Sequence, residues 1–408
     1  MIKISAKSKT ISGSINLEAS KSISNRLLII RELCDNKFNI ENLSNAKDTR
    51  ILTKILNDFK SQKDIDCEDA GTALRFALSF LATKVGNWVL SGSKRMHERP
   101  IDPLVKSLTD LGAEINYLKN KGFPPIQIKE KKLKGKKLRV KGDVSSQFIS
   151  SLLMIAPKLE NGIQLEIVSK VLSKPYIEMT LGLMREFGIE YTWEKKIIKI
   201  ENQHYVGKKI VVENDWSAAS FWYSFVSLSK SGNIEIPNLY SSSLQGDSIL
   251  SNIYSRLGVN TEFKKNSIIL TKKDLVENAL ELDLSNYPDL GLPIIVTCAG
   301  LGIKAHLKGL KNLEIKESKR LEVIQKELEK FNINTQIDNS SISITENQKI
   351  KQPSSTIECH NDHRIPMSIA PLSVKINSIS FEDKNVVNKS YPDFWKDLET
   401  VGISCVNS

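Results

Sequence analysis

The chain has 408 residues, 40% of them hydrophobic, which suits two to four domains with substantial cores and excludes a disordered or fibrous protein. Lys and Arg number 58 against 47 Asp and Glu, so the formal net charge is +11 at pH 7. This excess leaves three classes of partner open: nucleic acid, an anionic surface, or small anionic substrates.

Apolar stretches are short throughout the chain. The stretch from Leu292 to Ile303 is among the longest and falls well short of the ~20 residues that span a membrane. The opening MIKISAKSKT has no apolar signal core. We therefore expect a soluble protein of the cytoplasm.

The cysteines are few and widely spaced, and no two form a C-x-x-C pair, so neither a disulfide framework nor a zinc site is indicated. They are Cys34, Cys67, Cys298, Cys359 and Cys405. We expect reduced, mostly buried thiols and no bound metal.

One pattern recurs along the chain: a helix-period apolar stretch ends at Gly or Asn and runs directly into alternating, strand-like residues. The segments are LVKSLTDLGAEINY, LGLMREFGIEYTW, LSNIYSRLGVNTEF, VIQKELEKFNINTQI and FWKDLETVGISCV. Their junction residues are Gly112, Gly188, Gly258, Asn332 and Gly402, spaced 70 to 76 residues apart. Gly or Asn is expected where a helix ends in the left-handed conformation.

A second set of helices interleaves with the first. Their starts are SKSISNRLLII, DAGTALRFALSF, VSSQFISSLLMI, NDWSAASFWYSF, YPDLGLPIIVTC and NDHRIPMSIAPL, marked by Lys21, Asp69, Ser145, Asp215, Asp289 and Asp362. The first two markers are 48 residues apart and the others 70 to 76. These helices are apolar nearly all round, which predicts burial, with the more amphipathic set outside.

The six units group most naturally as two halves, because a single core seldom exceeds about 250–300 residues. The chain is thus predicted to be α/β (α+β), with two domains of three repeated units and a boundary near Glu213 to Asp215.

Cations lie within a turn of several buried-helix starts: Lys21, Arg26, Arg75 and Arg364. Helix N-termini carry free N–H groups and partial positive charge, which attract anions. A single polar residue at such a start could be an ordinary cap. Several starts facing one space would form an anion-binding chamber.

Further charged and polar residues fall at predicted turns. The motif LSGSKRMHERPI holds Arg95 and Arg99, LSKPYIEMTL holds Ser173, Lys174 and Tyr176, LEIKESKRLEVI holds Lys316, Glu317 and Arg320, and NKSYPDFW holds Lys389. The spacing predicts that Lys316 and Arg320 lie at i,i+4 on one helical face.

Nine strings occur in the order, and at roughly the spacing, found in enolpyruvylshikimate-phosphate synthases, and the chain resembles that family over about residues 18 to 397. The strings are SKSISNR, DAGTALR, RMHERPI, VSSQF, SKPYIE, YPD, IKESKR, NDHR and NKSYPDFW.

The resemblance implies two globular domains joined by two crossovers, each with three βαβαββ-type units around buried parallel helices, in an inside-out α/β barrel-like fold. One domain would comprise residues 20–213, the other residues 1–19 with 214–408, and the active site would lie in the cleft between them.

The implied reaction transfers the enolpyruvyl group of phosphoenolpyruvate to the 5-hydroxyl of 3-phosphoshikimate and releases phosphate, on the route to chorismate and the aromatic amino acids. No cofactor or metal is implied. We expect a monomer whose partners are these small-molecule substrates, without nucleic acid or membrane.

The resemblance also implies site residues. For 3-phosphoshikimate they are Lys21, Ser22, Arg26, Ser145, Ser146, Gln147, Ser173, Tyr176, Asp289, Asn312 and Lys316. For phosphoenolpyruvate they are Lys21, Gly71, Arg99, Gln147, Arg320, Arg364 and Lys389. Serine hydroxyls and helix N–H groups suit a phosphate ester, whereas an Arg and Lys cluster suits a ligand with both carboxylate and phosphate.

Three of these residues would be catalytic by resemblance. Asp289 would take the proton of the reacting hydroxyl, while Glu317 and Lys21 would exchange protons with the methylene carbon and the bridging oxygen through a tetrahedral intermediate. Each such step is worth roughly 10²–10⁴-fold. The simpler alternatives are a helix cap for Asp289 and an i,i+3 partner of Arg320 for Glu317.

Some positions depart from the commoner family pattern. Asp69 stands where many members have Asn, which adds a negative charge beside a predicted anion site, unless it simply caps the helix. The segment from Lys47 to Arg50 and the Ser318-Lys319 pair also differ.

Two other functions remain open from the sequence. A UDP-N-acetylglucosamine enolpyruvyl transferase would share the architecture, although SKSISNR and SKPY favour the shikimate branch. A nucleic-acid-binding protein would suit the charge, but aromatic and basic residues do not interleave. Much of the charge lies in the run from Lys129 to Lys141, with eight basic residues and one acidic, which indicates a solvated segment.

Overall fold

The computed structural model describes residues 1–407, and the chain forms two compact units. Unit 1 contains Met1–Ala19 and continues from Glu213 onward, and unit 2 contains Ser20–Val212. The chain therefore passes from one unit to the other twice. No helix in residues 1–407 has the length and apolarity needed to cross a membrane.

Unit 2 has three sheets. The first has the order β4 (Asp64–Asp66), β5 (Trp88–Ser91), β7 (Ile126–Lys129), β6 (Glu114–Tyr117), and the second has the order β10 (Thr192–Glu194), β11 (Ile197–Ile200), β9 (Ile163–Ile167), β8 (Lys137–Val140). In each, the first two strands in sequence pair in parallel and the other neighbours are antiparallel. The third is the parallel pair β3 (Ile40–Glu41) and β12 (Ile210–Val211).

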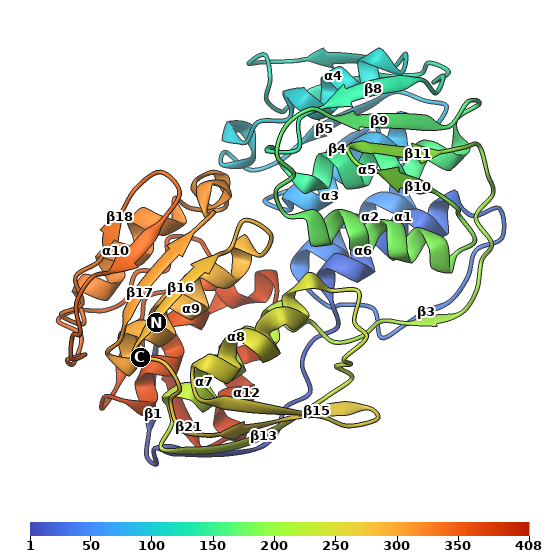
Figure 1. The fold of residues 1–408 in the computed structure, drawn as a ribbon. Helices are drawn as coiled ribbons and strands as arrows, with labels where there is room; N and C mark the ends of the chain where they lie inside the picture. Colours follow the sequence, from blue (N-terminus) through green and yellow to red (C-terminus); the bar gives the residue numbers. More distant parts are fainter. Residues whose placement is uncertain (408) are drawn as a thin grey trace. The chain divides into compact units, whose positions relative to one another are not determined.

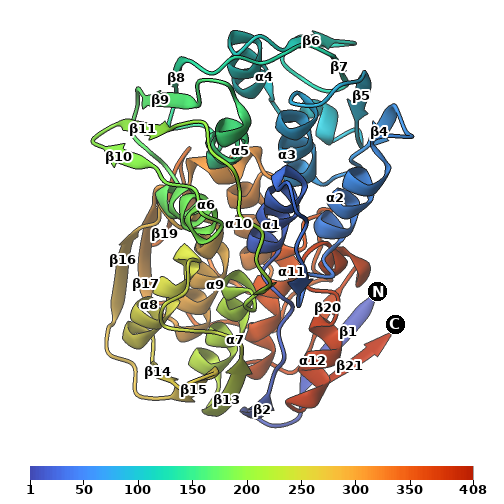
Figure 2. The ribbon, with the colours of Figure 1, turned by 90° about the vertical axis from the view of Figure 1, so that its right-hand side faces the viewer.

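Unit 1 repeats the four-stranded arrangement twice. One sheet has the order β14 (Val259–Phe263), β15 (Ser267–Lys272), β13 (Ser231–Pro237), β2 (Thr10–Ser14), and the other β16 (Ala279–Asp283), β17 (Lys304–Lys308), β19 (Ile342–Ile344), β18 (Gln336–Ile337). In the third sheet β1 (Ile2–Ala6) lies between β20 (Ile379–Phe381) and β21 (Ile403–Asn407), so the chain ends lie side by side (Figure 2).

Each unit is built around three helices that contact one another. In unit 2 they are α1 (Lys21–Leu33), α3 (Gly71–Leu81) and α5 (Ser146–Ile155), and in unit 1 they are α7 (Trp216–Leu228), α9 (Gly291–Leu301) and α11 (Arg364–Ile369). Figure 1 labels α1, α3, α5, α7 and α9. In α7 every residue but one is buried, because its apolar side chains cover its whole circumference. The predicted burial of this set is confirmed.

The second set of helices is more amphipathic. It comprises α2 (Lys47–Asp58), α4 (Asp102–Asp110), α6 (Lys174–Glu186), α8 (Leu250–Arg256), α10 (Arg320–Glu329) and α12 (Phe394–Thr400). In α2 the apolar side chains that are buried are Ile51, Leu52, Ile55 and Leu56, at helical spacing on one face.

The predicted junctions end five of these helices. Gly112, Gly188, Gly258, Asn332 and Gly402 all have positive φ, from 64° to 108°, as left-handed helix ends require. Each is followed by a strand or a strand-like segment. The short gap between the first two helix starts also has a structural reason: α2 leads into the single strand β4, and the hairpin that follows α4, α6, α8 and α10 is missing there.

The lysine-rich run from Lys129 to Lys141 includes the short strand β8 and the segment before it. All eight of its basic residues are exposed, and the apolar Leu133, Leu138 and Val140 are buried. The run is a solvated segment, as predicted.

Candidate functional site

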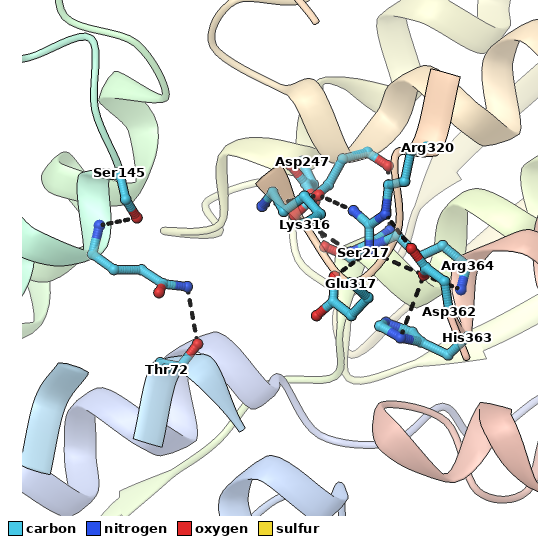
Figure 3. A network of polar contacts seen from close by, with 12 residues as sticks. Thr72, Ser145, Ser217, Asp247, Lys316, Glu317, Arg320, Asp362, His363 and Arg364 are labelled. Carbon is cyan, nitrogen blue, oxygen red and sulfur yellow. Dashed lines mark hydrogen bonds and ion pairs between the residues drawn. The ribbon is translucent and has the colours of Figure 1, made fainter. Parts of the chain in front are cut away.

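A buried guanidinium organises the charged residues of unit 1. Arg320, the first residue of α10, is 1% exposed. Its Nη1 lies 3.0 Å from Asp289 Oδ1, and its Nη2 lies 2.8 Å from Glu317 Oε2. Its Nε and Nη2 donate to the two oxygens of Asp362 at 2.7 and 3.1 Å. Figure 3 shows Glu317 and Asp362 turned toward this guanidinium. The three carboxylates stabilise its charge and raise the pKa of Arg320, although burial alone would lower it.

Asp289 lies in the short 3-10 turn Pro288–Leu290, directly before α9. The N-cap of α9 is Leu290, whose side chain makes no capping bond, so the alternative of Asp289 as an ordinary cap is wrong. Its carboxylate meets two further cations, Lys316 Nζ at 3.4 Å and Arg364 Nη2 at 3.6 Å.

Burial by itself would raise the pKa of Asp289. The charges of Arg364, Lys316 and Arg320 outweigh that effect and hold the pKa well below its usual range. Asp289 is therefore ionised in the free protein and is a weak base while these cations surround it.

Lys316 does not lie on a helix, so the predicted i,i+4 relation with Arg320 on one helical face is wrong. Residues Lys311–Ile315 form a 3-10 turn, Lys316 follows it in an extended conformation, and α10 begins only at Arg320. The side chain still reaches the cluster through its contact with Asp289. Burial is the largest effect on Lys316 and lowers its pKa.

Lys389 extends the cluster from the 3-10 turn Asn385–Lys389. Its side chain is buried, and Nζ lies 3.5 Å from Glu317 Oε1. Glu317 thus bridges Lys389 and Arg320, and its predicted i,i+3 pairing with Arg320 is confirmed.

The turn before α11 supplies a further carboxylate, that of Asp362. In the sequence this residue only marked the start of a buried helix, and no role was predicted for it. Asp362 is fully buried; besides Arg320, it accepts hydrogen bonds from Ser318 Oγ at 3.0 Å and from the backbone N–H of Arg364 at 3.1 Å. His363 Nδ1 lies 3.8 Å away. Asp362 therefore joins the starts of α10 and α11, and its position two residues before Arg364 was the only local signal.

Asp247 is a second residue that the sequence missed. It is buried in the 3-10 turn Gly246–Ile249 and accepts a hydrogen bond from Ser217 Oγ, at the start of α7 (Figure 3). Burial raises the pKa of Asp247 to about 6, and the charges of Asp289 and Arg364 also act on it. The sequence around it, LQGDS, carries no motif that points to this role.

Unit 2 holds its central cation differently. Arg26, on α1, is 2% exposed, and its guanidinium donates to Thr180 Oγ1 at 2.6 Å and to Ser150 Oγ at 3.2 Å. It also donates to the carbonyls of Ser22 and Tyr176 at 2.9 and 3.2 Å. No carboxylate pairs with it among residues 1–407. Burial lowers the pKa of Arg26 to about 10, which leaves it charged at neutral pH.

Gln147 connects the starts of α3 and α5. Its Nε2 donates to Thr72 Oγ1 at 2.9 Å, and its Oε1 accepts from Arg75 Nη1 at 2.8 Å. Ser145 is the N-cap of α5, and its Oγ accepts from the backbone N–H of Gln147 at 3.4 Å (Figure 3).

The start of α3 has the features of an anion site. Its N-cap, Ala70, has no capping side chain. A Cβ on Gly71 would lie only 2.7 Å from Nη1 of both Arg75 and Arg99, so the two guanidiniums converge there and would have to shift to admit a larger residue. Arg99 is 9% exposed, and its Nε has no hydrogen-bond partner within residues 1–407. Two guanidiniums at an uncapped helix start suit a phosphate or carboxylate.

Lys21 begins α1 and pairs with a residue that the sequence did not single out. Its Nζ lies 3.4 Å from Oδ2 of Asp48, in the first turn of α2, and the Asp48 side chain is 4% exposed. The two residues are 27 positions apart, and no local pattern links them.

Three further residues implied by the resemblance are Ser146, Ser173 and Asn312. Ser146 is the first residue of α5, and Ser173 is the N-cap of α6 with a left-handed φ of 55°. Asn312 lies in the turn after β17, is partly exposed, and makes no hydrogen bond with the charged cluster within the described chain.

One other group could hold a metal ion. Glu327, Glu358 and His360 offer ligand atoms within 4.8 Å of one another. The ammonium of Lys330 already lies 2.9 Å from Glu327 Oε2, so a metal ion here would compete with this lysine for the carboxylate.

The chain is similar in sequence to known proteins. The profile of a family described as EPSP synthase (3-phosphoshikimate 1-carboxyvinyltransferase) matches residues 5–68 and 57–398. A 3-phosphoshikimate 1-carboxyvinyltransferase of Bacteroides fragilis (strain YCH46) is 40% identical over 394 residues, 96% of each chain. One from Sulfurovum sp. (strain NBC37-1) is 30% identical over 418 residues, 96% of this chain and 97% of the relative.

A solved structure also resembles the chain. An EPSP synthase of Acinetobacter baumannii superposes with a TM-score of 0.77 at 19% identity, covering 100% of this chain and 99% of the other. The likeness supports the two-domain inside-out α/β fold.

Proposed function

The chain belongs to the EPSP synthase family, and from this membership we infer that it is a 3-phosphoshikimate 1-carboxyvinyltransferase. It transfers the enolpyruvyl group of phosphoenolpyruvate to the 5-hydroxyl of 3-phosphoshikimate and releases phosphate, a step toward chorismate and the aromatic amino acids. The observation that carries this conclusion is 40% identity over 96% of the chain to a relative of that name. The UDP-N-acetylglucosamine enolpyruvyl transferase is not favoured.

We propose that the phosphate ester of 3-phosphoshikimate binds where hydroxyls and the guanidinium of Arg26 meet in unit 2. Arg26 keeps its charge among hydroxyl and carbonyl oxygens, and Ser145 and Ser146 lie at the start of α5. Helix N–H groups, serine hydroxyls and a guanidinium together suit a phosphate.

Phosphoenolpyruvate is assigned to the more strongly charged groups. It bears both a carboxylate and a phosphate, which suits the paired guanidiniums near Gly71 and the cations Arg320, Arg364 and Lys389. The two ligand sets include residues of both units, so the proposal requires both units to act on the same substrates.

Asp289 is proposed as the base. Its low pKa in the free protein results from the cations around it, and an anionic substrate that engages Arg320 and Arg364 would weaken their hold. The pKa of Asp289 would then rise toward a range in which it accepts the proton of the 5-hydroxyl as that oxygen bonds to the central carbon of phosphoenolpyruvate.

The acid step balances this proton transfer. Glu317 and Lys21 are proposed to deliver a proton to the methylene carbon, which gives the tetrahedral ketal. The bond to phosphate then breaks, and a proton leaves the new methyl group to restore the double bond. Lys389 and Arg320 lie on either side of the Glu317 carboxylate and hold its orientation.

Phosphate release tests the activity. The protein is supplied with phosphoenolpyruvate and either 3-phosphoshikimate or UDP-N-acetylglucosamine. We expect release only with 3-phosphoshikimate. Release only with the sugar nucleotide, or with neither acceptor, would contradict the proposed function.

From the sequence, we further propose that the enzyme is a monomer and is cytoplasmic. Light scattering after gel filtration should give the mass of one chain, 45.8 kDa, and twice that mass would contradict the monomer.

A further inference from the structure

Two carboxylates directly precede the anion site at the start of α3. Glu68 and Asp69 lie in the turn between β4 and α3, with Gly71 two residues farther on. Negative charge near a helix N-terminus stabilises the helix, but it also repels an anion bound at the same end. An unbalanced pair of carboxylates here would weaken the binding of a doubly anionic substrate.

The turn that carries these carboxylates is held in place by its backbone. The N–H of Cys67 donates to the carbonyl of Ser91 at 2.9 Å, and the carbonyl of Glu68 accepts from Ser93 at 2.8 Å. Glu68 has a left-handed φ of 47°. These hydrogen bonds join the turn to the segment that runs from Ser91 to Arg99. The backbone that carries the two carboxylates is therefore bonded to the segment that carries the Arg99 guanidinium.

A lysine from another helix pairs with both carboxylates and offsets one of their two charges. Lys47, the first residue of α2, places Nζ 2.7 Å from Glu68 Oε2 and 3.1 Å from Asp69 Oδ1. The hydrogen bond with Glu68 is the largest effect on Lys47 and raises its pKa. The side chains of Lys47 and Asp69 are each more than a third exposed, so the pair adds little to folding stability.

We propose that Lys47 is a charge-compensating residue that sets the affinity of the α3 start for its anionic substrate, which, on the proposed function, is phosphoenolpyruvate. Lys47 does not touch that substrate. It acts by offsetting one of the two negative charges of Asp69 and Glu68, so that Arg75, Arg99 and the helix start keep a net positive field.

The proposal is tested by a charge-removal cycle. Steady-state rates are measured in low salt with saturating 3-phosphoshikimate and varied phosphoenolpyruvate, for wild type, Lys47→Gln, Asp69→Asn and the double variant. By Coulomb's law near a protein surface, Lys47→Gln should raise KM for phosphoenolpyruvate about threefold to fivefold with kcat nearly unchanged. The double variant should recover most of that loss. Lys54→Gln, an exposed lysine of the same helix, is the matched control and should change neither constant.

The salt dependence of KM distinguishes an electrostatic role of Lys47 from a structural one. The KM difference between Lys47→Gln and wild type should shrink in high salt, because a field at an exposed site is screened. A KM for Lys47→Gln equal to that of wild type in low salt would overturn the proposal. An equal rise in KM in Lys47→Gln and in the double variant would also overturn it. So would a rise in KM in the single variant Asp69→Asn. A wild-type protein without activity would instead refute the proposed function, and the inference would fall with it.

Discussion

The two units surround their central guanidiniums with different chemistry. In unit 1, Arg320 meets the carboxylates of Asp289, Glu317 and Asp362. In unit 2, within residues 1–407, Arg26 donates hydrogen bonds only to hydroxyl and carbonyl oxygens. A cation paired with carboxylates has its charge neutralised, whereas one held by neutral oxygens remains available to an anion.

On the proposed function, this difference gives the two units separate tasks. Unit 2 presents positive charge that is ready for a phosphate ester. Unit 1 presents carboxylates whose protonation depends on how strongly their cations are engaged, which suits proton transfer. The following predictions test this division, beginning with the largest expected effect.

Asp289→Ala should break the chemistry of unit 1. If Asp289 is the base, kcat should fall by about 10²–10⁴-fold, while the affinity for 3-phosphoshikimate changes far less. Stopped assays of phosphate release give kcat. Asp274→Ala, an exposed aspartate of the same unit, is the control and should be near wild type. Near-normal turnover in Asp289→Ala would remove it from the base role.

The two guanidiniums should differ in what their loss costs. Arg320→Met leaves the fully buried Asp362 without its cation, which should lower the free energy of unfolding by about 3–5 kcal/mol. Arg26→Met leaves hydroxyls and carbonyls without a donor, at about 1–3 kcal/mol. Urea unfolding of both variants measures the comparison. A larger loss of unfolding free energy in Arg26→Met than in Arg320→Met would contradict the importance of the carboxylate pairing for stability.

The pH dependence of stability should reflect Asp247. Its pKa of about 6 in the folded protein exceeds the ordinary 3.8, so between those values the folded state binds more protons than the unfolded state. Stability should therefore fall as pH rises from about 4 to 6, by up to about 2–3 kcal/mol from this group.

Asp247→Asn should flatten that fall in the free energy of unfolding. The partly buried Asp397, whose pKa burial also raises to about 6, should leave a smaller slope in the same window. Urea unfolding at several pH values is the measurement. An unchanged slope in Asp247→Asn would show that the pKa of this carboxyl is not raised in the folded protein.

Asp48→Asn should give the smallest effect. Loss of the carboxylate 3.4 Å from Lys21 Nζ leaves this side chain less well placed, and kcat/KM should fall about threefold to tenfold, since a partly buried ion pair contributes on the order of 1 kcal/mol. Asp58→Asn, at the other end of α2, is the matched control. Equal losses in both variants would indicate a general defect of the helix.

Local signals predicted much of the fold from the sequence. Gly112, Gly188, Gly258, Asn332 and Gly402 marked the repeat because a left-handed helix end restricts residue type at one position. The buried helices were evident because apolar residues surround them, as in α7.

The parts that escaped prediction depend on contacts distant in sequence. The pairings of Lys21 with Asp48, and of Ser217 with Asp247, join residues 27 and 30 positions apart. The start of α10 was misplaced because the segment around Lys316 has helical spacing, yet it forms a 3-10 turn followed by extended backbone. The sequence therefore indicated which charged residues gather in unit 1, but not their partners or their backbone conformation.

Calorimetric titration of 3-phosphoshikimate into Arg26→Met and Asp289→Ala tests the division of tasks most directly. The account predicts that Arg26→Met binds at least about tenfold more weakly, as loss of a charge-assisted hydrogen bond implies, while Asp289→Ala binds within a few-fold of wild type despite its lost turnover. Weak binding by Asp289→Ala together with normal binding by Arg26→Met would contradict it.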